Sequence, residues 1–473
     1  MPISSPGLAS GVDIQGIVSR LVALERAPLA PLQQQAASFQ SKLSIYGTLK
    51  SMVSALGDAA AKMGTASAWD LVKGGSTAPD KVGISVAAGT APTSMSIEVQ
   101  ALAKAQSNAS TAVPNGSALG GGTLSIQLGS WATGTFAAGS ADAVAVTVDA
   151  QDSLSTIATK INAAGAGVSA TVLRDASGER LLMRSTATGE VNGFRIQVTD
   201  DDGINTDATG LSGLAYDQVA GNFHGMALSQ AGSNALATIN NTPISSASNT
   251  VKDALPGITL TLSQETTAPV ELSVLNDKDG MRKNIQAFVD AYNAINNMLA
   301  TATKYDPDTK VAGSLQGDST AVGLQNALRG MMRSVTPGGS FTRLADIGID
   351  IKTGGVMSID ATKLDAALAD PAGLKNLFSN AGSSPTSRGF ALKVDAFADG
   401  LLAANGMMTT RSESLSNAIK RNEKEQDKVT DRAARAEVRL LAQYNAMDAA
   451  VGRLSGLNAF VAQQITLWNN QKA

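Results

Sequence analysis

Side chains that could serve as catalytic bases, nucleophiles or metal ligands are scarce in this sequence. The chain has one histidine and no cysteine, so it cannot build an HExxH metal site or a set of zinc-thiolate ligands. Disulfides and thiolate nucleophiles are excluded for the same reason. The histidine, His224, lies in a segment that is typical of a loop, Gly221-Asn222-Phe223-His224-Gly225. We interpret it as a loop residue rather than a general base, and the sequence predicts no enzyme.

Glycine-rich and acidic motifs are the remaining candidates for ligand binding. The segment GAGVSA (165–170) matches a dinucleotide fingerprint, but it follows a predicted helix and precedes a predicted strand, the reverse of the required order. We interpret it as a helix cap and turn. The clusters DDDG (200–203) and NDKDG (276–280) offer oxygen ligands for calcium, but they lack the alternating ligand order and the final Glu. They are interpreted as turns and caps, with a weak surface ion site as the alternative, and no cofactor is predicted.

The charge balance and the N-terminal segment restrict partners and location. The chain has 37 Lys and Arg residues and 40 Asp and Glu residues, a net charge of −3. It therefore lacks the excess of basic residues that is typical of nucleic-acid-binding proteins. The segment 420–439 carries both signs and is interpreted as a solvated helix face. Residues 1–7 lack the basic start and apolar run of a cleaved signal peptide, and no later stretch could span a bilayer. We expect no membrane insertion, and either a cytoplasmic protein or export by a route that reads no cleavable signal.

The elements that must position any functional side chain include long helices at both ends of the chain. The 473 residues are 43% hydrophobic but only 4% aromatic, which favours several domains with cores of Ala, Val, Ile and Leu. A short helix, with Ser10 and Asp13 as cap residues and ended by Pro28 and Pro31, precedes a longer helix over 32–63. Apolar residues recur every three or four positions in the first helix (Ile14, Ile17, Val18, Leu21, Val22), in the second (Leu32, Phe39, Leu43, Tyr46, Leu49, Val53, Leu56) and towards the C-terminus (Leu415, Ile419, Val429, Leu440, Tyr444, Met447, Val451, Leu454, Val461, Ile465, Trp468). These seams predict coiled-coil-like pairing between the two ends.

Two features predict that this seam is weak. Gly57, Gly452 and Gly456 interrupt it, and each glycine costs about 1 kcal/mol in a helix. Asn422 and Gln426 take seam positions, where polar residues fix register at a cost in stability; the alternative is a helix end that is not packed there. We therefore expect contacts that can be made and broken.

Between the helical ends the apolar period changes to two, which predicts antiparallel strands. The alternating segments are 82–86, 95–99, 124–128, 144–148, 194–198, 258–262 and 270–274. One short helix, 154–164, is expected to begin at Asp152 or Ser153 and to end at Gly165. Turn-rich stretches at 107–122 and 200–233 mark the entry and exit of an inserted domain.

Helical periodicity returns at Asp279, and this helix is expected to pack on the helix over 32–63. Further on, Asp318 is predicted to cap a helix, 347–359 to form a β-hairpin, and Asp360 to begin a helix that Pro371 limits. The predicted fold class is α+β and multidomain, with terminal coiled-coil-like helices forming a leg and a helical bundle, and two central, mainly antiparallel β domains forming a head. The predicted divisions are 1–42 with 416–473 (terminal leg helices), 43–76 with 277–415 (helical leg base), 77–106 with 234–276 (β head domain) and 107–233 (inserted second β head domain).

A series of motifs occurs in order along nearly the whole chain. They are GLASGVDIQGIV (7–18) with Leu24-Glu25, YGTLKS (46–51), IEVQALAKAQ (97–106), SNTVKDALPGITL (248–260), AYNA (291–294), GDST (317–320) and LADIGI (344–349). Together they resemble the flagellar filament capping proteins, a family also called hook-associated protein 2.

The resemblance implies a legged, plate-like cap at the distal end of the flagellar filament. Terminal helices would form mobile legs inserted in the filament end, and β domains would form a self-assembled homo-oligomeric ring beneath which flagellin folds without being lost. The expected leg and filament-contact residues are Ile14, Ile17, Leu21, Leu32, Phe39, Leu43, Val451, Leu454, Val461 and Ile465; those of intramolecular helix packing are Tyr46, Leu49, Val53, Leu56, Ile285, Phe288, Tyr292 and Ile295; and those that contact an export chaperone are Met447, Val451, Leu454, Leu457 and Val461.

The same resemblance implies further partners and a location. The partners are flagellin, the hook–filament junction proteins and a flagellar export chaperone, and the location is extracellular, at the flagellum tip, after export by the flagellar type III apparatus. Two alternatives remain open at this point. One is a surface adhesin whose residues 107–227 bind mucin or another glycan, and the other is a different axial protein, such as flagellin or a hook-junction protein.

Overall fold

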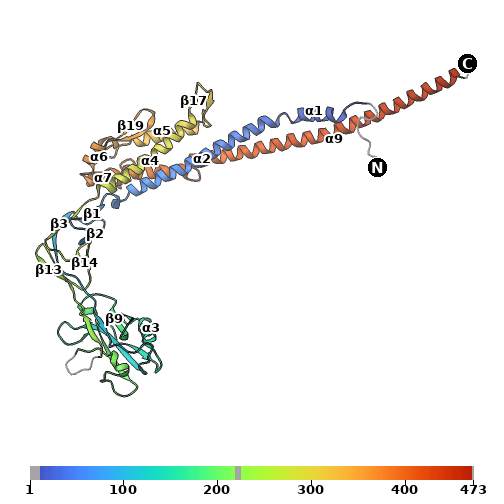
Figure 1. Cartoon of the computed structure of the whole chain (residues 1–473). Helices are drawn as coiled ribbons and strands as arrows, with labels where there is room; N and C mark the ends of the chain where they lie inside the picture. The colour runs from blue at the N-terminus through green and yellow to red at the C-terminus, as the bar shows by residue number, and fades with distance from the viewer. Residues whose placement is uncertain (1–10, 219–224, 471–473) are drawn as a thin grey trace. The chain divides into compact units, whose positions relative to one another are not determined.

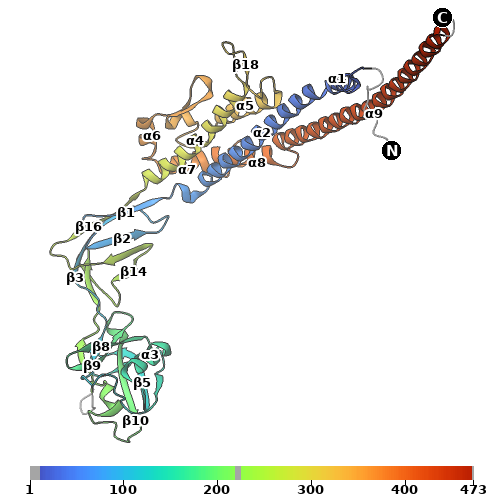
Figure 2. The ribbon, with the colours of Figure 1, turned by 45° about the vertical axis from the view of Figure 1, so that its right-hand side comes forward.

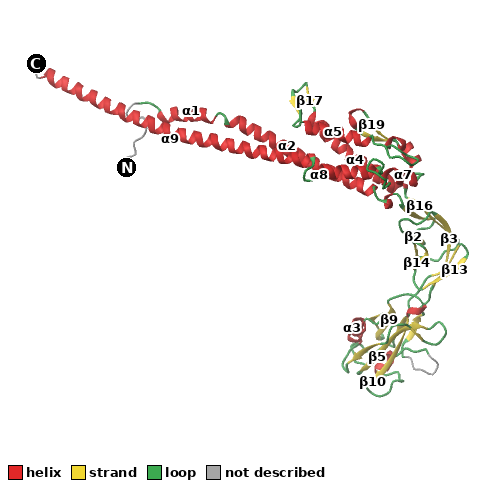
Figure 3. Ribbon diagram, turned by 180° about the vertical axis from the view of Figure 1, so that it is seen from behind, coloured by secondary structure: helices red, strands yellow, loops and turns green. Residues whose placement is uncertain are grey.

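The computed structural model describes residues 11–218 and 225–470. The chain divides into two compact units: a helical unit, formed by the chain up to Trp69 and from Asp279 onward, and a β unit, Asp70–Lys278. Helices dominate the first and antiparallel strands the second (Figure 3). The predicted fold class is therefore confirmed, with helical ends around a β middle. None of the helices in the described part of the chain is long and apolar enough to cross a membrane.

The helical unit is built from the two ends of the chain. Its helices are α1 (Ile14–Arg26), α2 (Leu29–Met63), α4 (Lys278–Thr303), α5 (Ser319–Met332), α6 (Ala361–Ala367), α7 (Pro371–Ser379), α8 (Phe390–Leu402) and α9 (Met407–Asn470), with short 3-10 turns η1 (Ala66–Ala68), η4 (Leu344–Ile347) and η5 (Thr353–Gly355). Two small hairpins join β17 (Tyr305–Asp306) to β18 (Val311–Ala312) and β19 (Ile349–Ile351) to β20 (Met357–Ile359). The caps predicted at Asp13, Asp318 and Asp360 are confirmed, since each carboxylate accepts a backbone N–H of the first turn.

Prolines behave differently from the prediction at two helix starts. The second helix begins at Leu29 rather than Leu32, so that Pro31 lies inside its first turn. Pro371 does not merely limit α6, because it is the first residue of α7, with Asp370 as the cap. Both sites tolerate proline because the first N–H groups of a helix have no intrahelical acceptor.

The core of the helical unit combines helices from both ends of the chain. The closest neighbours of α2 are α8 and α9, and Phe288 of α4 meets Phe390 of α8 edge to face, with ring centroids 5.6 Å apart. Trp69, which is 1% exposed, stacks on Phe378 of α7 at 4.8 Å and donates its indole N–H to the Met63 carbonyl. Helix α8, which was not predicted, lies beside α2, and the packing of α4 on α2 stays a prediction.

Within the β unit, the first hydrophobic core lies between two antiparallel sheets (Figure 2). One sheet has the order β1 (Val72–Ser76), β16 (Val270–Asn276), β3 (Thr93–Ala101), β12 (Ala235–Ile239) and β13 (Thr242–Ser246); the other has the order β14 (Thr250–Leu255), β15 (Ile258–Leu262) and β2 (Val82–Val86). Strands from the two segments assigned to the first β head domain, 77–106 and 234–276, pair directly, since Ile97 lies opposite both Ile239 and Val270.

A second hydrophobic core belongs to the inserted segment, between β4 and β11. Its sheets have the orders β10 (Gly193–Asp200), β5 (Gly122–Ser130), β6 (Ala137–Ala138), with β7 (Val144–Val148) also on β5, and β11 (Ala227–Gln230), β4 (Ser107–Ala109), β9 (Gly178–Ser185), β8 (Val168–Asp175); the remaining elements are α3 (Leu154–Ala164), η2 (Glu190–Asn192) and η3 (Gly210–Leu214). The bounds predicted for α3 are confirmed, with Ser153 as the N-cap and Gly165 in the left-handed region. The strand predicted to follow residues 165–170 is β8, whereas β9 was missed because charged residues interrupt its apolar alternation.

Amide side chains pair with the backbone at four strand or loop edges. Each side-chain amide accepts the backbone N–H of one partner residue and donates to the backbone carbonyl of that same partner, as a neighbouring strand would. The pairs are Gln106 with Phe194, Asn162 with Ala170, Asn249 with Ala103, and Asn293 with Met357. These contacts satisfy backbone groups that regular pairing leaves open.

Gln106 is the most buried of these amides, at 1% exposed. It accepts from Phe194 N at 2.9 Å, donates to Phe194 O at 3.0 Å and also donates to Asn108 Oδ1 at 2.8 Å. We expect Gln106→Leu to destabilise the inserted β segment by about 1 to 3 kcal/mol, because buried polar groups lose their partner. Chemical denaturation followed by Trp131 fluorescence measures the change. Gln100→Leu, the same change at an exposed strand position, is expected to shift stability by about 0.5 kcal/mol or less; equal effects from both would contradict this role of Gln106.

Candidate functional site

The terminal helices run antiparallel in a single register. Gln35 of α2 accepts a hydrogen bond from Asn422 of α9 at 3.0 Å, and Glu25 of α1 pairs with Arg432 at 3.0 Å. As residue numbers fall along α2 and then α1, the contacted numbers rise along α9. Figure 1 shows α1 and α2 following one another along α9. The break between α1 and α2 therefore leaves the register intact.

Helix α1 closes a small apolar cluster of its own on α9. Ile14, Val18 and Val22 are 0%, 3% and 5% exposed, and they surround the fully buried Ala433. Leu440, Leu441 and Tyr444 pack against the same cluster. We call Ala433–Tyr444 the covered section of α9, because α1 shields it.

Beyond Tyr444 the seam continues, half-buried at Val451 and exposed at Met447, Leu454, Val461 and Ile465. Met447, Val451, Leu454, Val461 and Ile465 keep a spacing of four, three, seven and four residues, and we call them the distal face of α9. Leu454 is 63% exposed and Ile465 51% exposed. A helix that exposes a regular apolar stripe of this length is typical of a surface for another helix.

The structure places the predicted site residues in three environments. The set expected for intramolecular packing is fully or almost fully buried, at 0–1% exposed: Tyr46, Leu49, Val53, Leu56, Ile285, Phe288, Tyr292 and Ile295. Of the expected leg residues, Ile14 is buried, whereas Ile17, Leu21, Leu32, Phe39, Leu43 and Val451 are half-buried. Exposed residues are Leu454, Val461 and Ile465, together with Met447 and Leu457 of the chaperone set. Their assignment to filament or chaperone stays a prediction.

Sequence reasoning missed part of the exposed apolar surface of α9. Phe460 and Leu467 are 56% and 52% exposed, and with Leu457 they form a second row beside the distal face at spacings of three and seven. The helical spacing of these residues was visible in the sequence. It was overlooked because only one apolar seam was sought on each helix. The exposed end of α9 therefore presents apolar side chains over a wider arc than a two-stranded coiled coil needs.

A polar layer interrupts the α2–α9 seam. Asn422 is 5% exposed and donates to Gln35 Oε1, and Gln426 donates to Asn422 Oδ1 at 2.6 Å. The predicted seam position of Asn422 is thereby confirmed, and the alternative of an unpacked helix end is wrong at this residue. Such a buried amide specifies register because any shifted pairing leaves it without a partner.

We expect Asn422→Leu combined with Gln35→Leu to raise the thermal unfolding midpoint of the helical unit, because an apolar layer replaces a polar one. The same variant should lose its unique register. Two cysteine pairs measure the register, since the wild-type chain has no cysteine. Cysteines at 25 and 432 crosslink in the native register, and cysteines at 22 and 432 crosslink in a shifted one. A lower midpoint, or an unchanged crosslinking pattern, would contradict the assignment.

Asp318 ties three helices together. One carboxylate oxygen accepts the Tyr46 hydroxyl of α2 at 2.9 Å, and the other accepts Arg411 Nη2 of α9 at 2.6 Å. The same side chain caps α5 through the Thr320 and Ala321 N–H groups. Burial is the largest single influence on this carboxyl and favours the neutral form, but the bonds from Arg411, Tyr46 and Ala321 together hold its pKa below the ordinary value. Burial, and then Asp318, raise the pKa of Tyr46.

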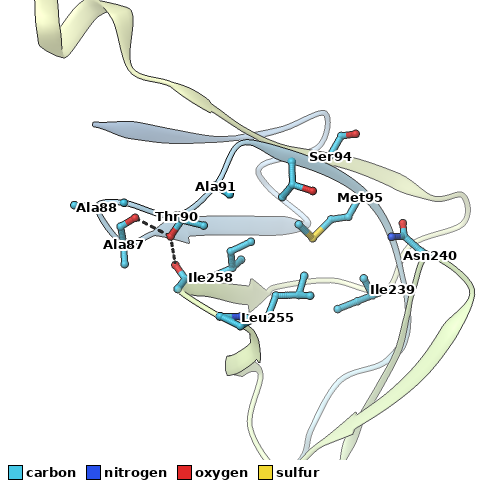
Figure 4. Close-up of a pocket in the computed structure, with 14 residues that line it drawn as sticks. Ala87, Ala88, Thr90, Ala91, Ser94, Met95, Ile239, Asn240, Leu255 and Ile258 are labelled. Carbon is cyan, nitrogen blue, oxygen red and sulfur yellow. Dashed lines mark hydrogen bonds between the residues drawn. The ribbon is translucent and has the colours of Figure 1, made fainter. Parts of the chain in front are cut away.

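The described part of the β unit contains an apolar cleft. A hollow of about 580 Å³ lies at one end of the first core, and Met95, Ile239, Leu255 and Ile258 line it (Figure 4). Its lining residues carry no charge, and the Thr90 hydroxyl already donates to the Ala87 carbonyl at 2.8 Å. The cleft can accept an apolar side chain, and its lining supplies no acid or base.

The acidic clusters act as turns and caps where the structure describes them. Asp200 is 6% exposed and accepts the Ser212 N–H at 2.9 Å, and Asp279 pairs with Arg282 at 2.9 Å. Within 11–218 and 225–470 no group of three or more His, Asp or Glu side chains is arranged to hold a metal ion. His224 lies outside the described residues.

Comparison with known proteins identifies the same family along nearly the whole chain. The family model described as "Flagellar hook-associated protein 2 N-terminus" matches residues 10–106, and that described as "Flagellar hook-associated protein 2 C-terminus" matches 232–456. Between them, residues 135–187 match the "Flagellin hook IN motif".

Relatives and a solved structure agree with these matches. The chain is 31% identical to flagellar hook-associated protein 2 of Escherichia coli K12 over 99% of both chains, and 29% identical to the B-type flagellar hook-associated protein 2 of Pseudomonas aeruginosa over 94% of both. A crystal structure of the flagellar cap protein FliD D1-D2-D3 domains from Escherichia coli matches with a TM-score of 0.64 at 29% identity, covering 79% of this chain and 99% of that one. These matches favour neither an adhesin nor another axial protein. The chain belongs to the flagellar hook-associated protein 2 family, the structural cap proteins of the bacterial flagellum.

Proposed function

We propose that this protein caps the distal end of the flagellar filament as a self-assembled ring, promotes folding and insertion of flagellin, and prevents loss of flagellin subunits. The observation that carries the proposal is the exposed distal face of α9, because a regular apolar stripe on a long helix needs a helical partner outside this chain. Family membership supports the location at the flagellum tip.

The legs of the cap are α1, the N-terminal part of α2 and the C-terminal part of α9. Each fully buried aliphatic side chain contributes about 1.5 to 3 kcal/mol, so contacts through Leu454, Val461 and Ile465 sum to a modest free energy. Gly452 and Gly456 lie in the same part of α9 and weaken the helix by about 1 kcal/mol each. Contacts of this free energy can dissociate and form again each time a flagellin subunit is inserted.

The two β domains form the plate and carry the contacts between subunits. Identical chains make a finite plate by closed rotational symmetry, and each of the two hydrophobic cores in the β unit supports one domain of that plate. The proposed divisions remain 1–42 with 416–473 for the legs, 43–76 with 277–415 for the leg base, 77–106 with 234–276 for the first β domain and 107–233 for the inserted one. The leg base contains the fully buried set around Tyr46 and Phe288, so it is the stable body that carries the legs.

Other partners follow from the same surface. Before export a chaperone covers the exposed apolar residues Met447, Leu454, Leu457 and Val461, because an exposed stripe would otherwise promote aggregation. After export by the flagellar type III apparatus, the same stripe faces flagellin or the hook–filament junction proteins. A single surface thus serves successive helical partners.

Complementation of a strain that lacks its own cap protein tests the proposed function. Cells that express this chain are expected to bear long filaments with a cap visible at the tip by electron microscopy, and to secrete little monomeric flagellin. Purified protein is expected to form discrete rings rather than filaments. Short filaments together with continued leakage of flagellin would refute the capping role, and filaments formed by the purified protein alone would indicate an axial subunit.

A further inference from the structure

The apolar face of α9 is covered only in part by α1. The covered section, Ala433–Tyr444, meets Ile14, Val18 and Val22, whereas the distal face that continues the same repeat to Ile465 is exposed. Without α1, the two would form one apolar face of 33 residues from Ala433 to Ile465, about 50 Å long at a rise of about 1.5 Å per residue. Helix α1 therefore determines how much of α9 is open to a partner.

The attachment of α1 to the rest of the helical unit is weak. Only Ile14, Val18 and Val22 of its 13 residues are buried, and a helix of this length is marginal by itself. Its ion pairs with α9, Glu25–Arg432 and Arg26–Glu437, are exposed and separated by 3.0 and 3.7 Å, so each contributes little to stability. The free energy that holds α1 on α9 comes mainly from three aliphatic side chains.

The connection between α1 and α2 forms a break at which α1 can separate alone. Helix α1 ends at Arg26, and α2 begins at Leu29 after Pro28, which has no N–H to continue the helical hydrogen bonds. One or two turns further along α2, Gln35 and Asn422 form the polar layer that holds α2 and α9 in register. Separation of α1 would stop at this layer, since α2 is secured beyond it by the buried Tyr46 and Leu49.

We propose that α1 is a removable cover on the filament-binding face of α9, displaced by a helix of another protein that binds in its place. This inference rests on the proposed capping function and specifies how the leg engages its partner. The incoming helix runs antiparallel to α9, as α1 does, because it first meets the distal face and then extends along the same repeat. Its chemistry resembles that of α1: aliphatic residues at four-residue intervals, then an acidic and a basic side chain opposite Arg432 and Glu437.

A reversible crosslink tests whether α1 must leave. The full-length protein with Val18→Cys and Leu440→Cys, whose native side chains belong to one cluster, is joined by a disulfide or a short bismaleimide; no other cysteine is present. The probe is a preparation of short, cap-free flagellar filaments, and capped ends are counted by electron microscopy. We expect the crosslinked protein to cap at least tenfold fewer ends, and reduction of the disulfide to restore capping. The reduced protein and Val18→Cys alone are the matched controls for folding.

The outcomes separate this inference from the proposed function. If the crosslinked protein caps as well as the reduced one, while Leu454→Asp with Ile465→Asp abolishes capping, α1 is not a cover but the distal face still binds. If none of these changes affects capping, the chain still caps filaments, but α1 is not a cover and the distal face is not the leg contact. If neither the crosslinked nor the reduced protein caps filament ends, the proposed function itself fails. Hydrogen exchange gives an independent readout: α1 and Ala433–Tyr444 are expected to exchange together and faster than Leu49–Leu56 of α2. Exchange of α1 as slow as that of α2 would overturn the inference.

Discussion

A chain that carries Leu454→Asp together with Ile465→Asp is expected to remain folded and to lose attachment to the filament tip. Both side chains are more than half exposed, at 63% and 51%, so the free energy of unfolding should change by about 0.5 kcal/mol or less. In a complex with another helix the same positions would be buried, and an unpaired carboxylate there costs several kcal/mol. Tip attachment should therefore fall by at least about a hundredfold, as measured by immunogold labelling of filament ends and by flagellin released into the medium.

Val438→Asp is the matched control for this experiment. Val438 is 70% exposed on the same helix, but it lies outside the repeat that joins Leu440 to Leu454. Capping should survive this substitution. If the double variant also retains capping, the distal face is not the leg contact; if Val438→Asp is equally damaging, α9 responds to charge anywhere along its length rather than at one face.

Replacement of Asp318 by Asn should destabilise the helical unit by about 3 kcal/mol. The substitution removes the charge that pairs with Arg411 and replaces one of the two acceptor oxygens by an NH2 donor, so that Tyr46 and Arg411 no longer each have an oxygen of their own. Loss of one member of a buried ion pair costs about 3 to 5 kcal/mol when the partner stays buried, and the lower value applies because the Arg411 side chain is 31% exposed. Thermal and chemical unfolding followed by near-ultraviolet circular dichroism gives the change.

The pH dependence of stability provides a second test of the same cluster. Because the folded-state pKa of Asp318 lies below the ordinary value of 3.8, ionised Asp318 stabilises the fold at all pH values above that ordinary value. This stabilisation is lost as the pH falls through the lower, folded-state pKa. The wild-type helical unit should therefore lose stability below about pH 4, and Asp318→Asn should show a flatter dependence there.

Asp308→Asn is the control, as it makes the same change at an exposed aspartate in the β17–β18 hairpin. Its stability should stay within about 0.5 kcal/mol of wild type. Equal destabilisation by the two substitutions, or an acid transition unchanged by Asp318→Asn, would show that the cluster does not hold α2, α5 and α9 together.

The sequence by itself determined the elements whose signals are local. A helix needs a cap and a 3.6-residue period, and both occur within a few residues: Ser153 and Gly165 delimit α3 as predicted, and Asp318 and Asp360 cap α5 and α6. Apolar alternation likewise located β5, β7, β10, β15 and β16, because one face of each strand is buried. The seam on α9 was also visible, since periodicity shows which residues share a face.

Only the tertiary structure decided which faces meet and which remain exposed. Periodicity does not identify a partner, so the place of α8 beside α2 could not be read from the sequence. Leu454 and Val18 looked alike in the sequence, although one is 63% and the other 3% exposed. Polar contacts between distant residues leave no local pattern. Gln106 with Phe194, and Asp318 with Tyr46 and Arg411, are pairs 88 to 272 residues apart that only the fold brings together. Local chemistry sets secondary structure, whereas burial and long-range pairing depend on the whole chain, and they decide which part of α9 is left for a partner.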